Sequence, residues 1–312
     1  MSHQDRFEII ANPAARQSGD AARLSVLIPF LRDDPTALLS ALDAQAAEVG
    51  AEIVLIDDGA PEAELTARVA EAVNAASAPA RLIVSRRNLG RSGARNALAG
   101  EAAAPWLIYL DADMQIGPQF LQLWAQETGS DAFDLAFGGY EPPEQVRPEQ
   151  RVHAALAHAG DVESAEARRE RGAAAFCGSN FAVRAKLMAE TPFDEGYVGW
   201  GWEDVDWAVR ANTAGRLTHI DNPARHGGLQ DASTLVAKFR AGGANHARLL
   251  LLHPDQRDRP AARLAILIKR LRLIALTRWF GLQLASGSIH PVRLRVLGLK
   301  LVRAAACAEH LP

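Results

Sequence analysis

The chain has 312 residues, of which 48% are hydrophobic and 23% charged, and its 24 glycines are scattered, which excludes collagen-like and wholly disordered proteins. Its only two cysteines, Cys177 and Cys307, cannot form a disulfide framework, so a reducing compartment is favoured. The N-terminal residues lack the apolar stretch of a secretory signal, and no apolar run reaches the roughly 18 residues of a spanning helix. We therefore expect a soluble, cytoplasmic protein of one large or two small domains.

The formal net charge of −3 conceals an uneven distribution of charge. Residues 257–312 carry eleven Lys and Arg against only Asp258 and Glu309, a surplus of nine positive charges. Residues 1–256 consequently carry a surplus of twelve negative charges. This asymmetry indicates that the basic C-terminal segment is a separate functional unit.

Short apolar runs alternate with helix-like stretches from residue 24 onward. The predicted strands are residues 24–30, 52–56, 81–85 and 106–110. Nearly continuous apolar strands separated by helices predict a parallel sheet covered on both faces, hence a doubly wound α/β half over residues 24–130. The following half is less regular: the predicted elements are a strand in 133–140, a helix in 149–171, an extended stretch in 173–183, a helix from near Trp202 and a strand in 217–220.

The expected domain order is a polar leader (1–22), an α/β domain (23–256) and a basic amphipathic helical tail (257–312). Within the tail, residues 261–284 and 291–306 mix apolar residues at helical spacing with Lys and Arg. Such helices suit an anionic membrane surface, or they pack on the main domain or between subunits. Nucleic-acid binding is disfavoured because aromatic residues are sparse in the tail.

Charged side chains gather where the predicted strands end, which is where open parallel sheets bind ligands. The residues at these ends are Pro29, Phe30 and Arg32 after the first strand, Asp57 and Asp58 after the second, Arg87 after the third, and Asp111 and Asp113 after the fourth. A crevice with both signs of charge suits a phosphate-bearing ligand that is held through a divalent metal.

Asp111 and Asp113 are two residues apart, so in an extended chain their side chains leave on the same side. Carboxylate oxygens at a strand end suit Mg²⁺ or Mn²⁺, although a solvated acidic turn has the same pattern. Asp58 suits a carboxylate that accepts from a base N–H or a ribose hydroxyl, while a helix-capping turn is the alternative. His226, after the last short strand, is a candidate third metal ligand or a structural histidine.

The segment 90–96 (GRSGARN) opens a helix whose free amides and Arg95 favour an anion. It contains no Gly-Lys-Ser/Thr and is therefore not a P-loop, and its glycine spacing fails the dinucleotide fingerprint.

The segment 199–206 (GWGWEDVD) is the most informative. Tryptophans between glycines suit a platform for a sugar ring, and the following acidic residues fall in the first turn of a helix, where the dipole favours ionised carboxylates. Asp204 is thus a candidate general base, while Asp206 lies about 200° around the helix and is interpreted as structural. An acidic helix start with chance tryptophans is the alternative.

In this order, the motifs IPF, DDG, NLGRSGARN, DAD, CGSN and GWGWEDVD, with a final His, resemble the family 2 glycosyltransferases of GT-A fold. The GWGWED segment is particularly similar to β-1,4-galactosyltransferases and bacterial chondroitin-type polymerases. The resemblance covers residues 24 to about 230. It implies a GT-A fold and inverting, metal-dependent transfer from a UDP-sugar, with Mn²⁺ or Mg²⁺ as cofactor.

The resemblance also assigns roles to individual residues. It implies nucleotide-sugar contacts for Pro29, Phe30, Arg32, Asp57, Asp58, Arg87, Arg95, Asp111, Gly178 and Glu203. It implies metal binding for Asp113, Asp111 and His226, catalysis by Asp204, and acceptor contacts for Trp200, Gly201, Trp202 and Glu203. Ser179, where the family often has glycine, is a mild departure.

The function expected from the resemblance is transfer of a hexose or N-acetylhexosamine to a saccharide or lipid-linked saccharide in bacterial surface polysaccharide biosynthesis. The single catalytic domain favours one linkage over processive synthesis. We expect a cytoplasmic enzyme, with peripheral contact to the inner face of the plasma membrane and a homo-oligomer both left open. The alternatives are an inactive relative that acts as a scaffold, or another nucleotide-sugar enzyme such as a pyrophosphorylase.

Overall fold

A computed structural model describes residues 6–18, 22–141, 145–160, 162–287 and 289–312. The chain forms two compact units, each assembled from separate stretches. The first consists of Met1–Glu141, Glu163–Glu195 and Trp207–Gly228, and the second of Pro142–Val162, Gly196–Asp206 and Leu229–Pro312.

The first unit is built on an eight-stranded mixed sheet in the order β1-β4-β3-β2-β5-β9-β7-β10. Its strands are β1 (Phe7–Ala11), β2 (Leu24–Phe30), β3 (Ala51–Asp57), β4 (Ala80–Ser85), β5 (Trp106–Leu110), β7 (Leu135–Phe137), β9 (Asn180–Arg184) and β10 (Leu217–His219). All but β1 and β9 run in the same direction. The predicted α/β class and mostly parallel sheet are therefore confirmed.

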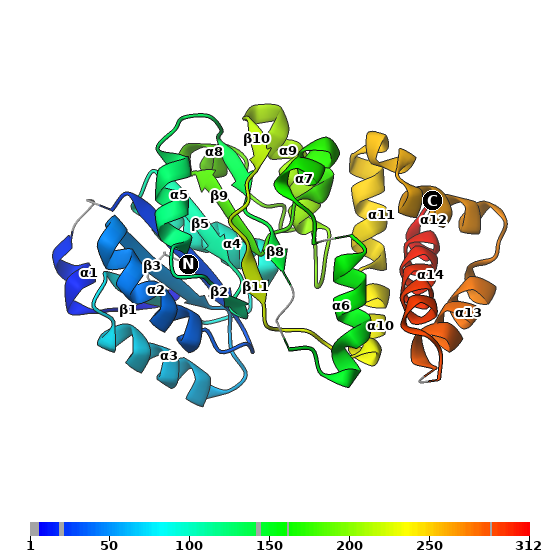
Figure 1. Ribbon diagram of the computed structural model, residues 1–312, viewed down its shortest axis with the longest axis horizontal. Coiled ribbons are helices and arrows are strands. Elements are labelled where there is room, and N and C mark those ends of the chain that lie inside the picture. The colour runs from blue at the N-terminus through cyan, green and yellow to red at the C-terminus, as the bar shows by residue number, and fades with distance from the viewer. Residues whose placement is uncertain (1–5, 19–21, 142–144, 161, 288) are drawn as a thin grey trace. The chain divides into compact units, whose positions relative to one another are not determined.

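Helices cover both faces of this sheet, because alternate residues of the buried strands point to opposite sides (Figure 1). One face packs on α2 (Thr36–Val49), α3 (Ala63–Ala75) and α5 (Phe120–Thr128). The other packs on α4 (Gly90–Glu101), α8 (Ala185–Glu190) and the part of α9 (Glu203–Ala214) that belongs to this unit.

The connections reverse direction between β2 and β5. From β2 the chain adds β3 and then β4 on one side, and it then returns to place β5 on the other side of β2. The carboxyl ends of β2 and β5 thus border the crevice that such a reversal creates in an open sheet.

A small second sheet completes this edge, in the order β6-β11-β8. Its strands are β6 (Met114–Gln115), β8 (Tyr140–Glu141) and β11 (Ala224–His226). In the register of β11 with β6, His226 lies opposite Met114, directly after Asp113.

Residues 7–18 of the expected polar leader are folded. β1 pairs antiparallel with β4, and α1 (Pro13–Ser18) follows it. Asn12, which is fully buried between them, donates to the carbonyls of Ala76 and Ala78 and accepts from the Ala80 amide. The expected leader therefore joins the sheet through the backbone pairing of β1 and one buried side-chain amide.

The irregular half differs from prediction in its details. The helix expected over 149–171 is two helices, α6 (Arg151–His158) and α7 (Ala165–Arg171), with the Ser164 hydroxyl capping the second through the Ala167 amide. The stretch expected to be extended over 173–183 includes the 3₁₀ turn Gly172–Ala175 before β9.

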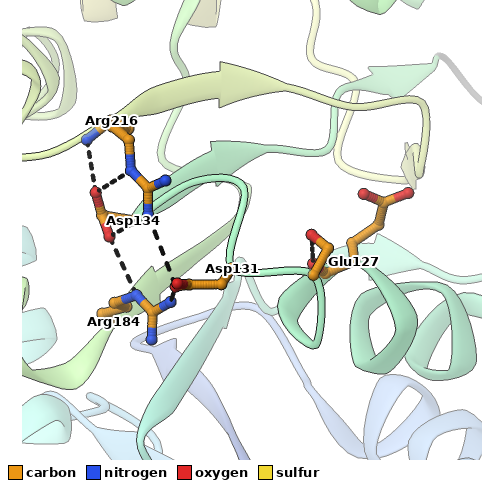
Figure 2. Close-up of polar contacts among 6 residues, drawn as sticks. Glu127, Asp131, Asp134, Arg184 and Arg216 are labelled. Atoms are coloured by element: carbon orange, nitrogen blue, oxygen red, sulfur yellow. Dashed lines mark hydrogen bonds and ion pairs between the residues drawn. The ribbon is translucent and has the colours of Figure 1, made fainter.

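An ion-pair network joins β9 to the turn before β10 (Figure 2). Asp134 accepts from Arg184 Nε at 3.1 Å and from Arg216 Nε at 3.0 Å, and Asp131 pairs with both arginines. Hydrogen bonds from Arg216 lower the pKa of Asp134 to about 2. The guanidinium of Arg184 also lies 4.6 Å from the Trp106 ring centroid.

The second unit is helical. Besides α6 it contains α10 (Ala232–Ala241), α11 (Gly243–Leu252), α12 (Pro260–Arg270), α13 (Ile274–Ser286) and α14 (Val292–His310), with 3₁₀ turns at Pro148–Gln150 and Pro254–Asp258. Two apolar clusters lie around α14, one with α10 and α13 and one with α11 and α12. In the part of the chain that is described, no helix combines the length and hydropathy that a membrane crossing requires.

Candidate active site

The turn after β3 separates its two adjacent carboxylates into different roles. Both oxygens of Asp57 are used within the protein, by the Ala60 amide and the Thr66 hydroxyl. Asp58 accepts from the Leu89 amide at 2.6 Å, and its carbonyl accepts from the Asn88 side chain, which ties this turn to the start of α4. Burial raises the pKa of Asp58 to about 6, and the charge of Asp57 adds to the rise. Asp57 is thus engaged within its own turn and α3, whereas Asp58 lies against the start of α4.

Arg95 and Asp111 form an ion pair at the carboxyl end of β5. Arg95 Nη2 lies 3.1 Å from Asp111 Oδ1 and donates to the Gly178 carbonyl at 3.2 Å. The Tyr109 hydroxyl donates to the Arg95 carbonyl, and the guanidinium lies 5.3 Å from the centroid of Phe193. Arg95 is almost completely buried, so its position is fixed by the protein and it leaves Asp111 partly exposed at the crevice.

Asp113 faces His226 across the small sheet, with 3.4 Å between Asp113 Oδ2 and His226 Nε2. A Cβ on Gly228 would lie 1.9 Å from that same Asp113 oxygen, so only glycine permits this approach. Burial raises the pKa of Asp113; His226 acts in the opposite direction, and the charges of Asp111 and Asp33 raise it further.

This donor set fits a divalent cation. The negative charges of Asp111 and Asp33 disfavour ionisation of Asp113, and a bound cation would relieve this repulsion. Mg²⁺ or Mn²⁺ needs only one or two protein carboxylates, because water and phosphate oxygens fill its remaining positions. Within the described ranges, no group of three or more His, Cys, Asp or Glu side chains is assembled in a geometry that holds a metal. Of the three predicted metal ligands the structure thus brings Asp113 and His226 together, whereas Asp111 is paired with Arg95.

The segment before β9 supplies backbone groups to the same edge. The Ser179 carbonyl accepts from the Asp111 amide, and the buried Asn180 side chain donates to the carbonyls of Gly139 and Asn222 at 2.8 Å. Gly178 is thus held beside Arg95. Of the other predicted nucleotide contacts, Phe30 is buried, Pro29 is half-buried, and Arg32 and Arg87 are exposed.

The GWGW loop, residues 199–202, belongs to the second unit and is held by α10 and α11. The Trp202 ring stacks on the His246 imidazole, with 3.8 Å between centroids and 7° between planes, and Trp200 packs against Phe239 at 5.6 Å. The Asn245 amide donates to the carbonyls of Val198 and Trp200. Each indole is half-buried, so the protein occupies part of the surface that was predicted to receive a sugar.

Trp202 has a φ of 76°, in the left-handed region that residues other than glycine rarely adopt. The stack on His246 holds it there, and burial lowers the pKa of His246 to about 3, so the imidazole is neutral. Strained backbone that the surrounding packing maintains is typical of functional loops.

The three acidic residues at the start of α9 have distinct surroundings. Glu203 is buried, and Asp204 is half-buried, with its carboxylate accepting from the Val205 amide at 2.9 Å. Asp206 is buried and lies 2.8 Å from His253 Nε2, which confirms its structural interpretation. Asp204 is therefore the most accessible carboxylate of this turn.

The sequence profile of glycosyl transferase family 2 matches residues 25–191, more than half of the chain. The protein belongs to this family. It is accordingly a glycosyltransferase, and the matched region contains Asp58, Arg95, Asp111 and Asp113. A search of curated proteins returned no match.

Solved glycosyltransferase structures share the fold. The mannosyltransferase PcManGT from Pyrobaculum calidifontis, in complex with GDP-Man and Mn²⁺, is 15% identical, with a TM-score of 0.55 over 93% of this chain and 87% of that one. GalNAc-T7 with UDP, GalNAc and Mn²⁺ is 18% identical, with a TM-score of 0.50 over 72% of this chain and 48% of that one. These similarities show the fold of the glycosyltransferase and leave its substrates open.

Sequence reasoning missed several residues of this glycosyltransferase that shape the two regions. Asp33, which influences Asp113, follows the first strand in LRDDP and could have been found by the strand-end rule. Asn245 and His246 carry no such local signal, because their partners lie more than 40 positions away in sequence.

Proposed function

We propose that this glycosyltransferase transfers a hexose or N-acetylhexosamine from a UDP-sugar to a saccharide or lipid-linked saccharide, with inversion at the anomeric carbon. The observation that carries the proposal is the clustering of Asp58, the Arg95–Asp111 pair and the Asp113–His226 pair at the carboxyl ends of β2–β5.

The donor's base would be read by Asp58, whose ionised carboxylate can accept from a base N–H. Arg95 would contact the nucleotide or its diphosphate, and Asp111 the ribose and the metal. Pro29, Phe30, Arg32, Arg87 and Gly178 would line the same crevice. Asp57 would support this turn from inside. Binding of GDP-Man by PcManGT and of UDP by GalNAc-T7 supports a nucleotide-sugar donor in general, so GDP-mannose belongs in any donor test.

Mn²⁺ or Mg²⁺ would be held by Asp113 and His226, with Asp111 beside them. When bound, the ion would neutralise charge on the diphosphate as it departs. The Mn²⁺ in both structural neighbours supports this assignment.

Asp204 would act as the general base that removes the proton of an acceptor hydroxyl. Its exposure, greater than that of Glu203 and Asp206, supports this role. Glu203 would lie beside donor and acceptor, and Trp200, Gly201 and Trp202 would contact the acceptor. Attack by the hydroxyl oxygen as the diphosphate leaves, in a single in-line displacement, inverts the anomeric configuration.

The GWGWED sequence supports a relationship, within the family, to the β-1,4-galactosyltransferases and chondroitin-type polymerases. We further propose a catalytic domain over residues 23–256 that is followed by a basic tail over 257–312, whose helices pack with α10 and α11 in the second unit. The proposed role is bacterial surface polysaccharide assembly on the cytoplasmic side. A small metabolite as the natural acceptor would contradict that last assignment. A homo-oligomer is compatible with the proposal.

The test is release of nucleoside diphosphate from a panel of UDP-sugars and GDP-mannose, with Mn²⁺ or with EDTA. We expect metal-dependent turnover of one UDP-sugar. Turnover of GDP-mannose alone would replace the donor assignment, and failure to bind any nucleotide sugar, with or without metal, would favour the inactive scaffold.

A further inference from the structure

We propose that helices α12 and α13 form a surface that docks this protein on an anionic lipid membrane. The docking surface consists of residues from both helices and the turn between them: Leu267, Arg270, Leu271, Arg272, Leu273, Leu276, Trp279 and Phe280. All are exposed, and all lie in the second unit.

One face of α13 is used to pack on α14, and the opposite face is exposed. Gly281 and Ala285 are buried against α14, where a Cβ on Gly281 would lie 3.0 Å from the Gly298 carbonyl oxygen. Leu276, Trp279 and Phe280, at helical spacings of three and four, are 60%, 59% and 50% exposed. Small residues form the close contact of α13 with α14, so Leu276, Trp279 and Phe280 are not needed for this packing and can contact another surface.

The exposed apolar residues are concentrated in this part of the chain. In the described ranges, fourteen large hydrophobic residues are exposed, and eleven of them lie between positions 251 and 297. A contiguous exposed apolar patch with a polar surround is typical of an interaction surface. The turn alternates basic and apolar residues from Arg270 to Leu273, and all four are exposed.

The charge of this region identifies the chemistry of the partner. Between Asp258 and Glu309 the sequence has ten Lys and Arg and no acidic residue. Arg278 is partly neutralised by Glu309, 3.1 Å away, but Arg270 and Arg272 lie exposed within the surface itself. A surface that combines exposed Trp, Phe and Leu with unopposed positive charge complements anionic headgroups above an apolar layer.

The same charges disfavour a second copy of the chain as the occupant. In a two-fold contact this surface would meet itself, so arginines would face arginines. A nucleic acid would be attracted to the cations, but it gives no reason for the exposed leucines of α12 and α13. The described helices offer no membrane crossing, so docking would be interfacial.

The test is co-sedimentation of the full chain with vesicles of phosphatidylcholine alone or with about one third phosphatidylglycerol. Three variants are compared: the double substitution Trp279→Ala with Phe280→Ala, the pair Arg270→Gln with Arg272→Asn, and the control Leu123→Ala. Asn is chosen at 272 because that residue has a φ of 57°, which Asn tolerates. Leu123 is an exposed leucine of α5 in the first unit.

We expect binding to the anionic vesicles, at least about tenfold weaker binding to phosphatidylcholine alone, and a loss of similar size in both double variants but not in the control. Circular dichroism and thermal unfolding check that the variants are folded. The proposal would be overturned if the protein did not bind vesicles, or if all variants bound them equally. It would also be overturned if the protein bound no vesicles and the substitutions instead weakened self-association or DNA binding. The assay contains neither donor nor acceptor, so a wrong donor assignment would not affect it.

Discussion

The donor-side crevice and the GWGW loop are stabilised in different ways. In the crevice, groups at the ends of neighbouring strands contact one another directly, as Asp58 does with the Leu89 amide and Arg95 with Asp111. The GWGW loop is instead held from outside, by Asn245 and His246 on α11. The donor-side crevice therefore derives its geometry from the sheet, whereas the GWGW loop depends on packing with a helix far along the chain.

The largest effect is expected at Asp204. If it is the general base, Asp204→Asn should lower the turnover number by about 10² to 10⁴ while UDP affinity stays unchanged, since the donor crevice keeps its own contacts. Steady-state kinetics and calorimetry measure the two quantities, with Asp258→Asn, an exposed carboxylate of the tail, as control. Turnover within a few-fold of wild type would remove Asp204 from the catalytic role.

A smaller effect is expected when the stack under Trp202 is removed. His246→Ala should raise the KM for the acceptor severalfold and leave UDP affinity unchanged, because the loop loses the ring that holds its strained backbone. His246→Phe keeps a stacking ring and should restore most of the wild-type behaviour. If alanine and phenylalanine variants behave alike, the loop does not depend on the stack.

The donor crevice should show a pH dependence of its own. The pKa of Asp58 is raised to about 6, so its carboxyl is ionised at neutral pH and takes up a proton as the pH falls through that value. Uridine, which lacks the diphosphate and so does not report on the metal, should therefore bind less well below pH 6, by about tenfold per pH unit.

Asp58→Asn should abolish this dependence, and nuclear magnetic resonance titration can follow such weak binding. Uridine affinity that does not change between pH 7 and pH 5 would contradict a role for Asp58 in base recognition.

The smallest effect is expected at the ion-pair network of Figure 2, in which Arg184 lies opposite Trp106 at the start of β5, at the other end of that strand from the crevice. Because the folded pKa of Asp134 is about 2, below its usual value, its contribution to stability is complete above pH 4 and is lost as the pH falls toward 2. Asp134→Asn should thus lower the Tm by a few degrees at most at neutral pH, and by less in acid.

Asp131→Asn, in the more exposed member of the network, should have a still smaller effect by differential scanning fluorimetry. A larger decrease in Tm for Asp131→Asn than for Asp134→Asn would show that Asp131 contributes more to stability than Asp134, contrary to this prediction.

The parts of the fold that could be predicted are those with a local physical signal. Leu24–Phe30 and Trp106–Leu110 were predicted to the residue, because a strand buried on both faces is apolar throughout. Asp111 and Asp113, which follow Trp106–Leu110, were found by the same reasoning. β1 was missed because its five residues alternate poorly and its stability comes from pairing with β4.

The GWGW loop was recognised by composition alone, and the roles of its residues remain predictions. Its packing could not be predicted, because Trp202 and His246 are 44 positions apart and neither sequence context indicates a stack. The separation of Asp57 from Asp58 likewise depended on Thr66, one helical turn into α3.

The most direct test of the central claim is calorimetric titration of UDP into wild type and Asp113→Asn, each with Mn²⁺ and with EDTA. We expect Mn²⁺ to strengthen UDP binding to the wild type by at least about tenfold and to have little effect on the variant, because Asp113 would provide the principal carboxylate for the ion beside His226. Equal UDP binding by both proteins in Mn²⁺ would contradict a metal-bound diphosphate at this site.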